Sequence, residues 1–362
     1  MIRTAEHTAL ADSARRFVDT HYDPAVHRAR LSKPQPFDRV RWQQMAEFGW
    51  LGTAIDDDAG GSGLDFSYLS VLAEALGPAL MREPFASQTA LAGHFLQRAA
   101  AGTARDALLE RWLTGEMLAA VVECGPPDAD GPVSQVAMNV IDCGVADVFL
   151  VVDEASPDAA RIVASDAPGV SVTRHTTIDG RDLGNVEFMA EALAGDGIVE
   201  FRGGVRAALA EARALYALIL CSESLGVARA LVRTTCEYVH ERQQFGAAIG
   251  SFQALQHRLV DMLLACTRME SLVELARGAA DTAEFSLVGA TIDRMVLGTI
   301  EGARRIGREA IQLHGAIAIT DEYVVGHCVR RLTANEILLG GTGAVLERLA
   351  DTTERARASS RH

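Results

Sequence analysis

The spacing of apolar residues changes twice along this chain, and this limits the folds that the chain can adopt. In the first third, apolar residues such as Leu10, Ala14 and Phe17 recur at helical spacing, with charged residues between them. The pattern changes near Met117, so we expect residues 1–116 to form an α-helical domain. Further helices are predicted in this domain over Phe37–Phe48, Phe66–Leu76 and Ala86–Gly115.

Short segments rich in β-branched residues follow Met117, and turn residues such as Asp153 and Pro168-Gly169 separate them. Such a pattern is typical of a compact antiparallel domain. We therefore expect residues 117–204 to form a small β domain. Its strands are predicted at Ala119–Val122, Val148–Val152, Val170–Thr173 and Gly197–Phe201.

Helical periodicity returns at about Val205 and continues toward the end of the chain. An apolar stripe runs from Leu209 to Tyr238, and a second helix is predicted to begin near Ser251, a residue suited to an N-cap. We expect residues 205–362 to form a C-terminal helical domain. The order of helices, small β domain and helices predicts an α+β fold.

The charge of the chain excludes some classes of partner and mechanism. The formal net charge is -14, so nothing concentrates cations against nucleic-acid phosphates, and we expect no nucleic-acid partner. Lys33 is the single lysine, which leaves Schiff-base chemistry almost no candidate. A few arginines and backbone amides can still bind a polyanion locally.

The cysteines and histidines predict neither disulfides nor a metal site. The six cysteines are scattered without a CxxC pair, which fits a reducing compartment. The sequence shows no signal peptide and no uninterrupted apolar run of about 20 residues, so we expect a cytoplasmic protein without a membrane partner. Histidines spaced as His-x3-His or His-x4-His are absent from the sequence, and we expect no metal.

The most informative segment reads ERQQFGAAIGSFQALQ. The long helix is expected to end at Phe245, with Gly246 as its left-handed cap. Arg242 would then lie one turn before the helix end, where its planar guanidinium can bind phosphate oxygens in a bidentate manner. Gln253 lies at the start of the next predicted helix, where free backbone amides also favour phosphate.

A second segment places Gln312 just before Gly315, and a glycine lets the backbone approach a ligand closely. Taken singly, these residues also fit structural roles. An arginine near a helix C-terminus interacts favourably with the helix dipole, and Gly315 suits a helix cap. Only the whole set predicts an anion-binding surface.

These segments resemble those of the acyl-CoA dehydrogenase family. The segment from Arg242 is similar to the family's Arg-x-x-Phe-Gly…Phe-Gln-x-x-Gln pattern. A second match joins Ile311–Gly315 to Thr320–Tyr323, and a third joins Trp50–Gly52 to Gly60–Gly63. The matches fall in the family's order and extend over nearly the whole chain.

The resemblance implies an FAD-dependent enzyme with an N-terminal helical domain, a middle β domain and a C-terminal four-helix bundle. It also implies which residues hold the adenosine pyrophosphate of an FAD that belongs to a neighbouring subunit. These cofactor-binding residues are Arg242, Phe245, Gln253, Gln312 and Gly315.

The catalytic base of the family is missing from this sequence. Removal of the α-proton of an acyl-CoA thioester, while the β-hydride goes to flavin, requires a carboxylate. The resemblance places this carboxylate either before a Gly-Thr pair, where the chain has Gly340, or after the arginine of Arg-x-x-Phe-Gly, where it has Gln243. The middle domain also lacks the family's Thr-Glu-Pro strand end and has Val122-Glu123-Cys124-Gly125 without a hydroxyl.

A heteromeric enzyme explains the retained and the lost features together. By resemblance to bacterial heteromeric acyl-CoA dehydrogenases, we predict the non-catalytic (small or β) subunit of an α2β2 complex. A second dehydrogenase subunit would supply the base, and the complex would act on an acyl-CoA from fatty acid or sterol side-chain degradation. Two alternatives stay open: a homotetramer with a displaced base such as Glu241 or Glu336, and a non-enzymatic scaffold of the same fold.

Overall fold

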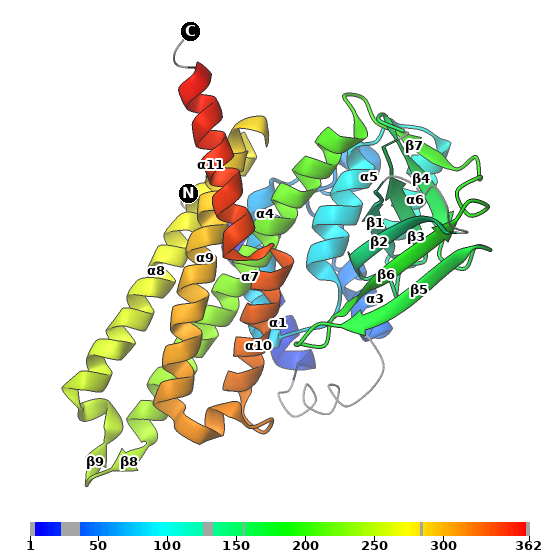
Figure 1. The fold of residues 1–362 in the computed structure, drawn as a ribbon. Helices are drawn as coiled ribbons and strands as arrows, with labels where there is room; N and C mark the ends of the chain where they lie inside the picture. Colours follow the sequence, from blue (N-terminus) through cyan, green and yellow to red (C-terminus); the bar gives the residue numbers. More distant parts are fainter. Residues whose placement is uncertain (1–3, 23–36, 126–132, 155, 283–284, 360–362) are drawn as a thin grey trace. The chain divides into compact units, whose positions relative to one another are not determined.

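The computed structural model describes residues 4–22, 37–125, 133–154, 156–282 and 285–359; Lys33 lies outside them. The chain divides into two compact units, and each is described by itself. The sheet unit contains Gln35–Leu69 and Arg82–Tyr216, and the helical unit contains Met1–Pro34, Ser70–Met81 and Ala217–His362. Helices, then strands, then helices follow one another along the chain (Figure 1), which confirms the predicted α+β class.

The N-terminal segment is helical, as predicted. Helix α3 begins after Asp38 because the Asp38 carboxylate accepts hydrogen bonds from the backbone N–H groups of Val40 and Arg41. The segment Ala86–Gly115, predicted to be helical, is helical on both sides of a break at Ala99, whose extended backbone (φ -68°, ψ 151°) ends α5 before α6 begins. The helices of this segment are α1 (Ala5–His21), α3 (Arg39–Glu47), α4 (Phe66–Leu76), the π-helix η3 (Ser87–Gly93), α5 (His94–Arg98) and α6 (Thr103–Leu113).

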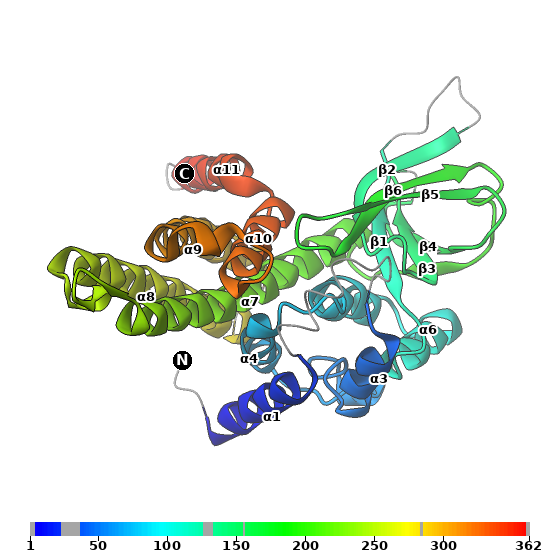
Figure 2. The ribbon, with the colours of Figure 1, turned by 90° about the horizontal axis from the view of Figure 1, so that it is seen from below.

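The middle segment forms two sheets, which Figure 2 shows as separate layers. One sheet has the strand order β1-β3-β4-β7 and the other β2-β6-β5. The expectation of a purely antiparallel domain is wrong at one pair: β1 and β3 are parallel, with Ala119 opposite Val148, because the intervening β2 joins the other sheet. The strands are β1 (Ala119–Glu123), β2 (Val133–Ile141), β3 (Val148–Val152), β4 (Ala159–Ala164), β5 (Val170–Thr176), β6 (Asp182–Met189) and β7 (Ile198–Glu200).

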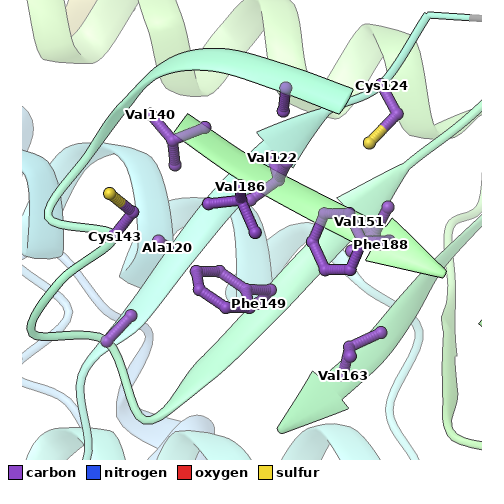
Figure 3. Close-up of a cluster of buried hydrophobic side chains, with 12 residues drawn as sticks. Ala120, Val122, Cys124, Val140, Cys143, Phe149, Val151, Val163, Val186 and Phe188 are labelled. Carbon is purple, nitrogen blue, oxygen red and sulfur yellow. The ribbon is translucent and has the colours of Figure 1, made fainter. Parts of the chain in front are cut away.

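An apolar cluster between the two sheets is the core of the sheet unit (Figure 3). Phe149 of β3 and Phe188 of β6 meet edge to face, with ring centroids 5.7 Å apart. Cys124 and Cys143 belong to the same cluster, and burial raises the pKa of each thiol to about 12. Both thiols therefore stay protonated and pack as small apolar residues.

The helical unit is held together by close backbone packing and by buried ion pairs. Helix α4 approaches α7 at Gly226, where a Cβ would lie 2.0 Å from the carbonyl oxygen of Glu74, so only glycine fits. The buried Arg277 of α8 donates hydrogen bonds to Ser70 and Glu74 of α4, each at 2.7 Å. The helical elements from α7 onward are α7 (Val205–Glu241), η4 (Ile249–Ser251), α8 (Gln253–Thr282), α9 (Phe285–His314), η5 (Gly315–Ile319), α10 (Val324–Leu338) and α11 (Gly341–Ser359).

Helix α7 is long enough and apolar enough to cross a membrane by length and composition alone. However, 78% of its most apolar window is buried inside the protein. Such burial is typical of a core helix, which is apolar on all sides because it is packed on all sides.

Candidate functional site

Helix α7 ends at Glu241, so the prediction that it continues to Phe245 is wrong. The backbone N–H of Arg242 donates to the carbonyl oxygen of Tyr238 at 2.9 Å, and the carbonyl of Arg242 accepts from the N–H of Ile249 at 2.8 Å. Between these bonds the chain forms a short hairpin of β8 (Gln243–Gln244) and β9 (Ala247–Ala248). Arg242 therefore lies at the base of a hairpin, directly after the helix.

Phe245 and Gly246 are the two turn residues of this hairpin. Their φ angles are +53° and +81°, two successive left-handed residues as in a type I′ turn. Glycine adopts this conformation readily, whereas a residue with a Cβ loses about 1–2 kcal/mol. Gly246 is thus a turn residue and not a helix cap. Because Phe245 is 91% exposed, its ring gains little from packing within the chain.

Gln253 is the first residue of α8, as predicted. Ser251, which the sequence suggested as the N-cap, lies in the preceding 3-10 turn and donates its hydroxyl to the carbonyl oxygen of Ala248 at 2.7 Å. The first backbone N–H groups of any helix lack partners within the helix. The exposed start of α8 can therefore bind an anion.

The end of α9 supplies the remaining predicted residues. The helix ends at His314, and Gly315 follows with a φ angle of +70°. Gln312 and Gly315 are both exposed. A Cβ on Gly315 would meet nothing within 4 Å, so a ligand can approach the backbone there.

Three helix ends meet at one end of the helical unit (Figure 1). The hairpin joins the end of α7 to the start of α8. Arg258 of α8 pairs with Glu309 of α9, with Nε and Oε2 2.6 Å apart. The hydroxyl of Tyr238 on α7 donates to the carbonyl oxygen of His314 at 3.3 Å. The five predicted residues therefore lie at the same end of this unit.

The side chains at this end suit a diphosphate. All five positions are exposed, and Arg242 has no ion-pair partner in the part of the chain that the structure describes. An unpaired guanidinium, two side-chain amides and the free amides of a helix start together provide the donors that phosphate oxygens require. Over the described ranges, no group of three or more His, Cys, Asp or Glu side chains could hold a metal ion.

The two positions that the resemblance assigns to a base carry no carboxylate in the structure. Gly340 is an exposed residue between α10 and α11, and Gln243 is exposed in β8. Glu336 of α10 accepts a hydrogen bond from Nε of Arg304 at 2.9 Å, so its charge is already paired. Glu241 is exposed at the end of α7.

Comparison with known proteins decides the family. Residues 4–116 match the family model "Acyl-CoA dehydrogenase, N-terminal domain", and residues 203–353 match the family model "Acyl-CoA dehydrogenase, C-terminal domain". This chain belongs to the acyl-CoA dehydrogenase family. Acyl-CoA dehydrogenase FadE27 of Mycobacterium tuberculosis is 28% identical to it over 371 aligned residues, which cover 94% of this chain and 96% of that protein.

Solved structures show the same fold. The ChsE4-ChsE5 complex from Mycobacterium tuberculosis matches with a TM-score of 0.85 and 22% identity, over 98% of each chain. The Tcur3481-Tcur3483 steroid ACAD G363A variant matches with a TM-score of 0.84 and 25% identity, over 98% of this chain and 99% of that chain. The acyl-CoA dehydrogenase fold of this protein, with helical, β and helical domains in succession, is thereby shown.

The middle domain of this acyl-CoA dehydrogenase has an ion-pair cluster where the resemblance implies a hydroxyl that contacts flavin. Glu123 at the end of β1 pairs with Arg206 at 2.9 Å and with Arg213 at 2.5 Å, all within the sheet unit. The carboxylate of Glu123 is therefore already paired with two arginines of the same chain.

A row of exposed apolar residues lies on α8. Val260, Leu263 and Leu264 are 53%, 56% and 62% exposed. We name these three residues the α8 ridge. Gln253 precedes Leu264 by eleven residues, which is about three helical turns, so the ridge lies on the same face as Gln253. Helical spacing identifies such a face but not the molecule that covers it.

Proposed function

We propose that this acyl-CoA dehydrogenase is the non-catalytic subunit of a heteromeric FAD-dependent enzyme and that it completes the FAD site of a second dehydrogenase subunit. The proposed assembly is a cytoplasmic α2β2 complex. One observation carries the proposal: Arg242, Phe245 and Gln253 are exposed together at one end of the helical unit, while Gly340 and Gln243 stand where a base is needed.

The residues of this chain would bind and orient the cofactor without moving a proton. FAD supplies the acceptor for the β-hydride. Arg242 would neutralise the pyrophosphate, Gln253 and Gln312 would donate amide hydrogen bonds, and Phe245 would pack its ring against the cofactor. The α-proton needs a carboxylate, which the partner subunit would provide.

The surface of the helical unit supports a protein partner. The α8 ridge exposes three large aliphatic side chains on the Gln253 face, and a partner that brings FAD to Gln253 would cover them. The similar solved structures are described as a ChsE4-ChsE5 complex and as the Tcur3481-Tcur3483 steroid ACAD. We therefore propose an acyl-CoA thioester with a bulky acyl group, such as a sterol side chain, as the substrate.

Co-expression with a candidate second dehydrogenase subunit tests the proposal. We expect a purified complex with one FAD for each pair of chains, and acyl-CoA oxidation only by the complex. Arg242→Gln in this chain should weaken FAD binding by the complex, whereas Arg233→Gln, on the exposed surface of α7, should not. One FAD for each chain would contradict the proposal, because it would mean that this subunit has an FAD site of its own.

The alternatives give different results in the same experiment. A homotetramer with a displaced base would oxidise acyl-CoA as the single chain and lose turnover on Glu241→Gln or Glu336→Gln. The ion pair of Glu336 with Arg304 and the solvent exposure of Glu241 disfavour both as bases, since a base must be free and desolvated. A scaffold would bind no FAD in any complex and would not raise the rate of acyl-CoA oxidation by a partner subunit.

A further inference from the structure

Three aromatic rings pack together where the ends of α7 and α9 meet. The ring of Tyr238 stacks on the imidazole of His314, with centroids 4.3 Å apart and an interplanar angle of 29°. Tyr323, which precedes α10, lies 5.2 Å from the His314 ring and 6.4 Å from the Tyr238 ring. We name these three residues the aromatic cluster. The cluster brings side chains from the end of α7 and the end of α9 into contact.

Hydrogen bonds fix the orientation of this cluster. The Tyr238 hydroxyl donates to the carbonyl oxygen of His314, which is one of the carbonyls that a helix C-terminus leaves without a partner. Nδ1 of His314 lies 2.8 Å from the carbonyl oxygen of Ala310; because a carbonyl only accepts, Nδ1 carries the hydrogen. Burial lowers the pKa of His314, so the ring is neutral and Nε2 is an acceptor.

Nε2 of His314 is buried without a hydrogen-bond partner over the described ranges of the chain, and the residue is only 4% exposed. A buried acceptor without a donor is unfavourable, and a leucine of similar size would avoid this loss. The histidine therefore fits a role that apolar packing alone does not explain.

Tyr238 and His314 lie close in sequence to proposed cofactor-binding residues, and Tyr323 follows a loop that a hydrogen bond fixes. Tyr238 precedes Arg242 by one helical turn, and His314 lies between Gln312 and Gly315. The loop before Tyr323 is itself fastened to α10, because His327 Nε2 lies 3.0 Å from the carbonyl oxygen of Asp321.

The other two junctions between these helix ends have their own connections. The hairpin joins α7 to α8 through its backbone hydrogen bonds, and the Arg258–Glu309 ion pair joins α8 to α9. At the junction between α7 and α9, the aromatic cluster supplies a direct side-chain connection. This direct connection adds to the indirect connection through α8.

We propose that Tyr238, His314 and Tyr323 are positioning residues, which hold Arg242 at a fixed separation from Gln312 and Gly315 so that both ends can bind one diphosphate. This inference rests on the proposed function, because it concerns the same cofactor site. It adds residues that do not touch the cofactor and act through the residues that do.

The first test measures how the end of α7 and the end of α9 depend on each other in the absence of cofactor, by hydrogen–deuterium exchange on the free chain. Tyr323→Leu should speed exchange of the β8–β9 hairpin by about tenfold, and Tyr238→Leu should speed exchange of η5 by a similar factor. Amides in the middle of α8 should keep their rates. Phe17→Leu removes a buried ring of α1 in the same unit and should leave both segments unchanged. Uniformly faster exchange through the helical unit in the cluster variants would overturn the inference.

The second test measures FAD affinity by adding FAD to the deflavinated complex of both subunits. Tyr238→Leu and Tyr323→Leu should weaken binding by about tenfold or more, whereas Tyr238→Phe, which keeps the ring, should recover most of the affinity. Phe17→Leu should bind FAD as the unaltered chain does.

The outcomes separate this inference from the proposed function. If Arg242→Gln weakens FAD binding and the cluster variants do not, the inference is wrong and the proposed function stands. If neither Arg242→Gln nor the cluster variants change FAD binding, both are wrong. If Arg242→Gln and the cluster variants all weaken FAD binding, and the cluster variants speed exchange of the hairpin and of η5, the inference and the proposed function are both supported.

Discussion

The ring of Phe245 meets the ring of Phe252 edge to face, with centroids 6.2 Å apart. Phe245 belongs to the hairpin turn, and Phe252 directly precedes α8. Phe252 is itself 40% exposed, so the contact orients the Phe245 ring without burying it. The chain thus keeps an aromatic ring in solvent on a left-handed residue, where a polar residue would be more stable.

Phe245→Asn should separate stability from binding. Asparagine tolerates the left-handed region, so the free energy of unfolding of the isolated chain should stay the same or rise by about 1 kcal/mol. The FAD affinity of the complex should fall, because the ring that packs on the cofactor is lost. Urea unfolding of the chain and FAD titration of the complex measure the two effects. A variant that is clearly less stable would show that the ring serves the fold.

The α8 ridge provides a test of the partner surface. Leu264→Arg places a charge at a position that is 62% exposed, so the isolated chain should unfold at an unchanged temperature. In the complex the charge would be buried without a partner, and we expect assembly to weaken by at least about 100-fold. Leu346→Arg on α11, at a position 50% exposed, is the matched control. Light scattering of the mixed subunits decides: a complex that survives Leu264→Arg excludes the ridge from the interface.

The parts of the fold that the sequence predicts are those with a strong local period. The prediction for α4 agrees with the structure at both ends, and β1 and β3 begin at the predicted residues. Strands β2, β4 and β6 were not predicted, because polar residues such as Gln135 and Arg161 interrupt their apolar pattern. Tertiary pairing decides those strands, and a single sequence does not reveal it.

At the candidate site, too, the sequence predicts local features but not the contacts that depend on the fold. Chemical type and order along the chain indicated Arg242 and Gln253, and the structure brings both to one end of the helical unit. The hairpin turn at Phe245 was mistaken for a helix end, since Phe-Gly suits either, and the backbone hydrogen bonds of β8 and β9 decide between them. The aromatic cluster could not be predicted, because Tyr238 and His314 are 76 residues apart in the sequence.

Gly340→Glu tests whether the missing carboxylate alone explains a non-catalytic role. A Cβ on Gly340 would lie 3.6 Å from the Cβ of Ala344, so there is room, but the φ angle of +87° disfavours any residue with a Cβ. We expect a loss of about 1–2 kcal/mol in stability and no acyl-CoA oxidation by the chain alone, assayed with an artificial electron acceptor. Gly340→Ala carries the same backbone strain without the acid and is the control. Turnover by Gly340→Glu alone would show a working flavin site within this chain.

Asp142 of the sheet unit makes the stability of the protein depend on pH. Its carboxylate is buried and accepts a hydrogen bond from the Ser87 hydroxyl. Burial raises the pKa of Asp142 to about 7, from an ordinary value of 3.8. The folded state therefore binds the proton more tightly than the unfolded state does. The stability from this group is fully present below about pH 4 and is lost as the pH rises through 7.

Asp142→Asn removes this dependence, because an amide is neutral at every pH and its oxygen still accepts the Ser87 hydrogen bond. At pH 4 the variant and the unaltered protein should have similar free energies of unfolding. At pH 8 the variant should be more stable, by at most roughly 4 kcal/mol. Urea unfolding at pH 4, 6 and 8 measures the difference, with the exposed Asp196→Asn as the control. A difference that stays constant between pH 4 and pH 8 would mean that Asp142 remains ionised in the folded protein, with its charge balanced by Arg181 and the Ser87 hydroxyl.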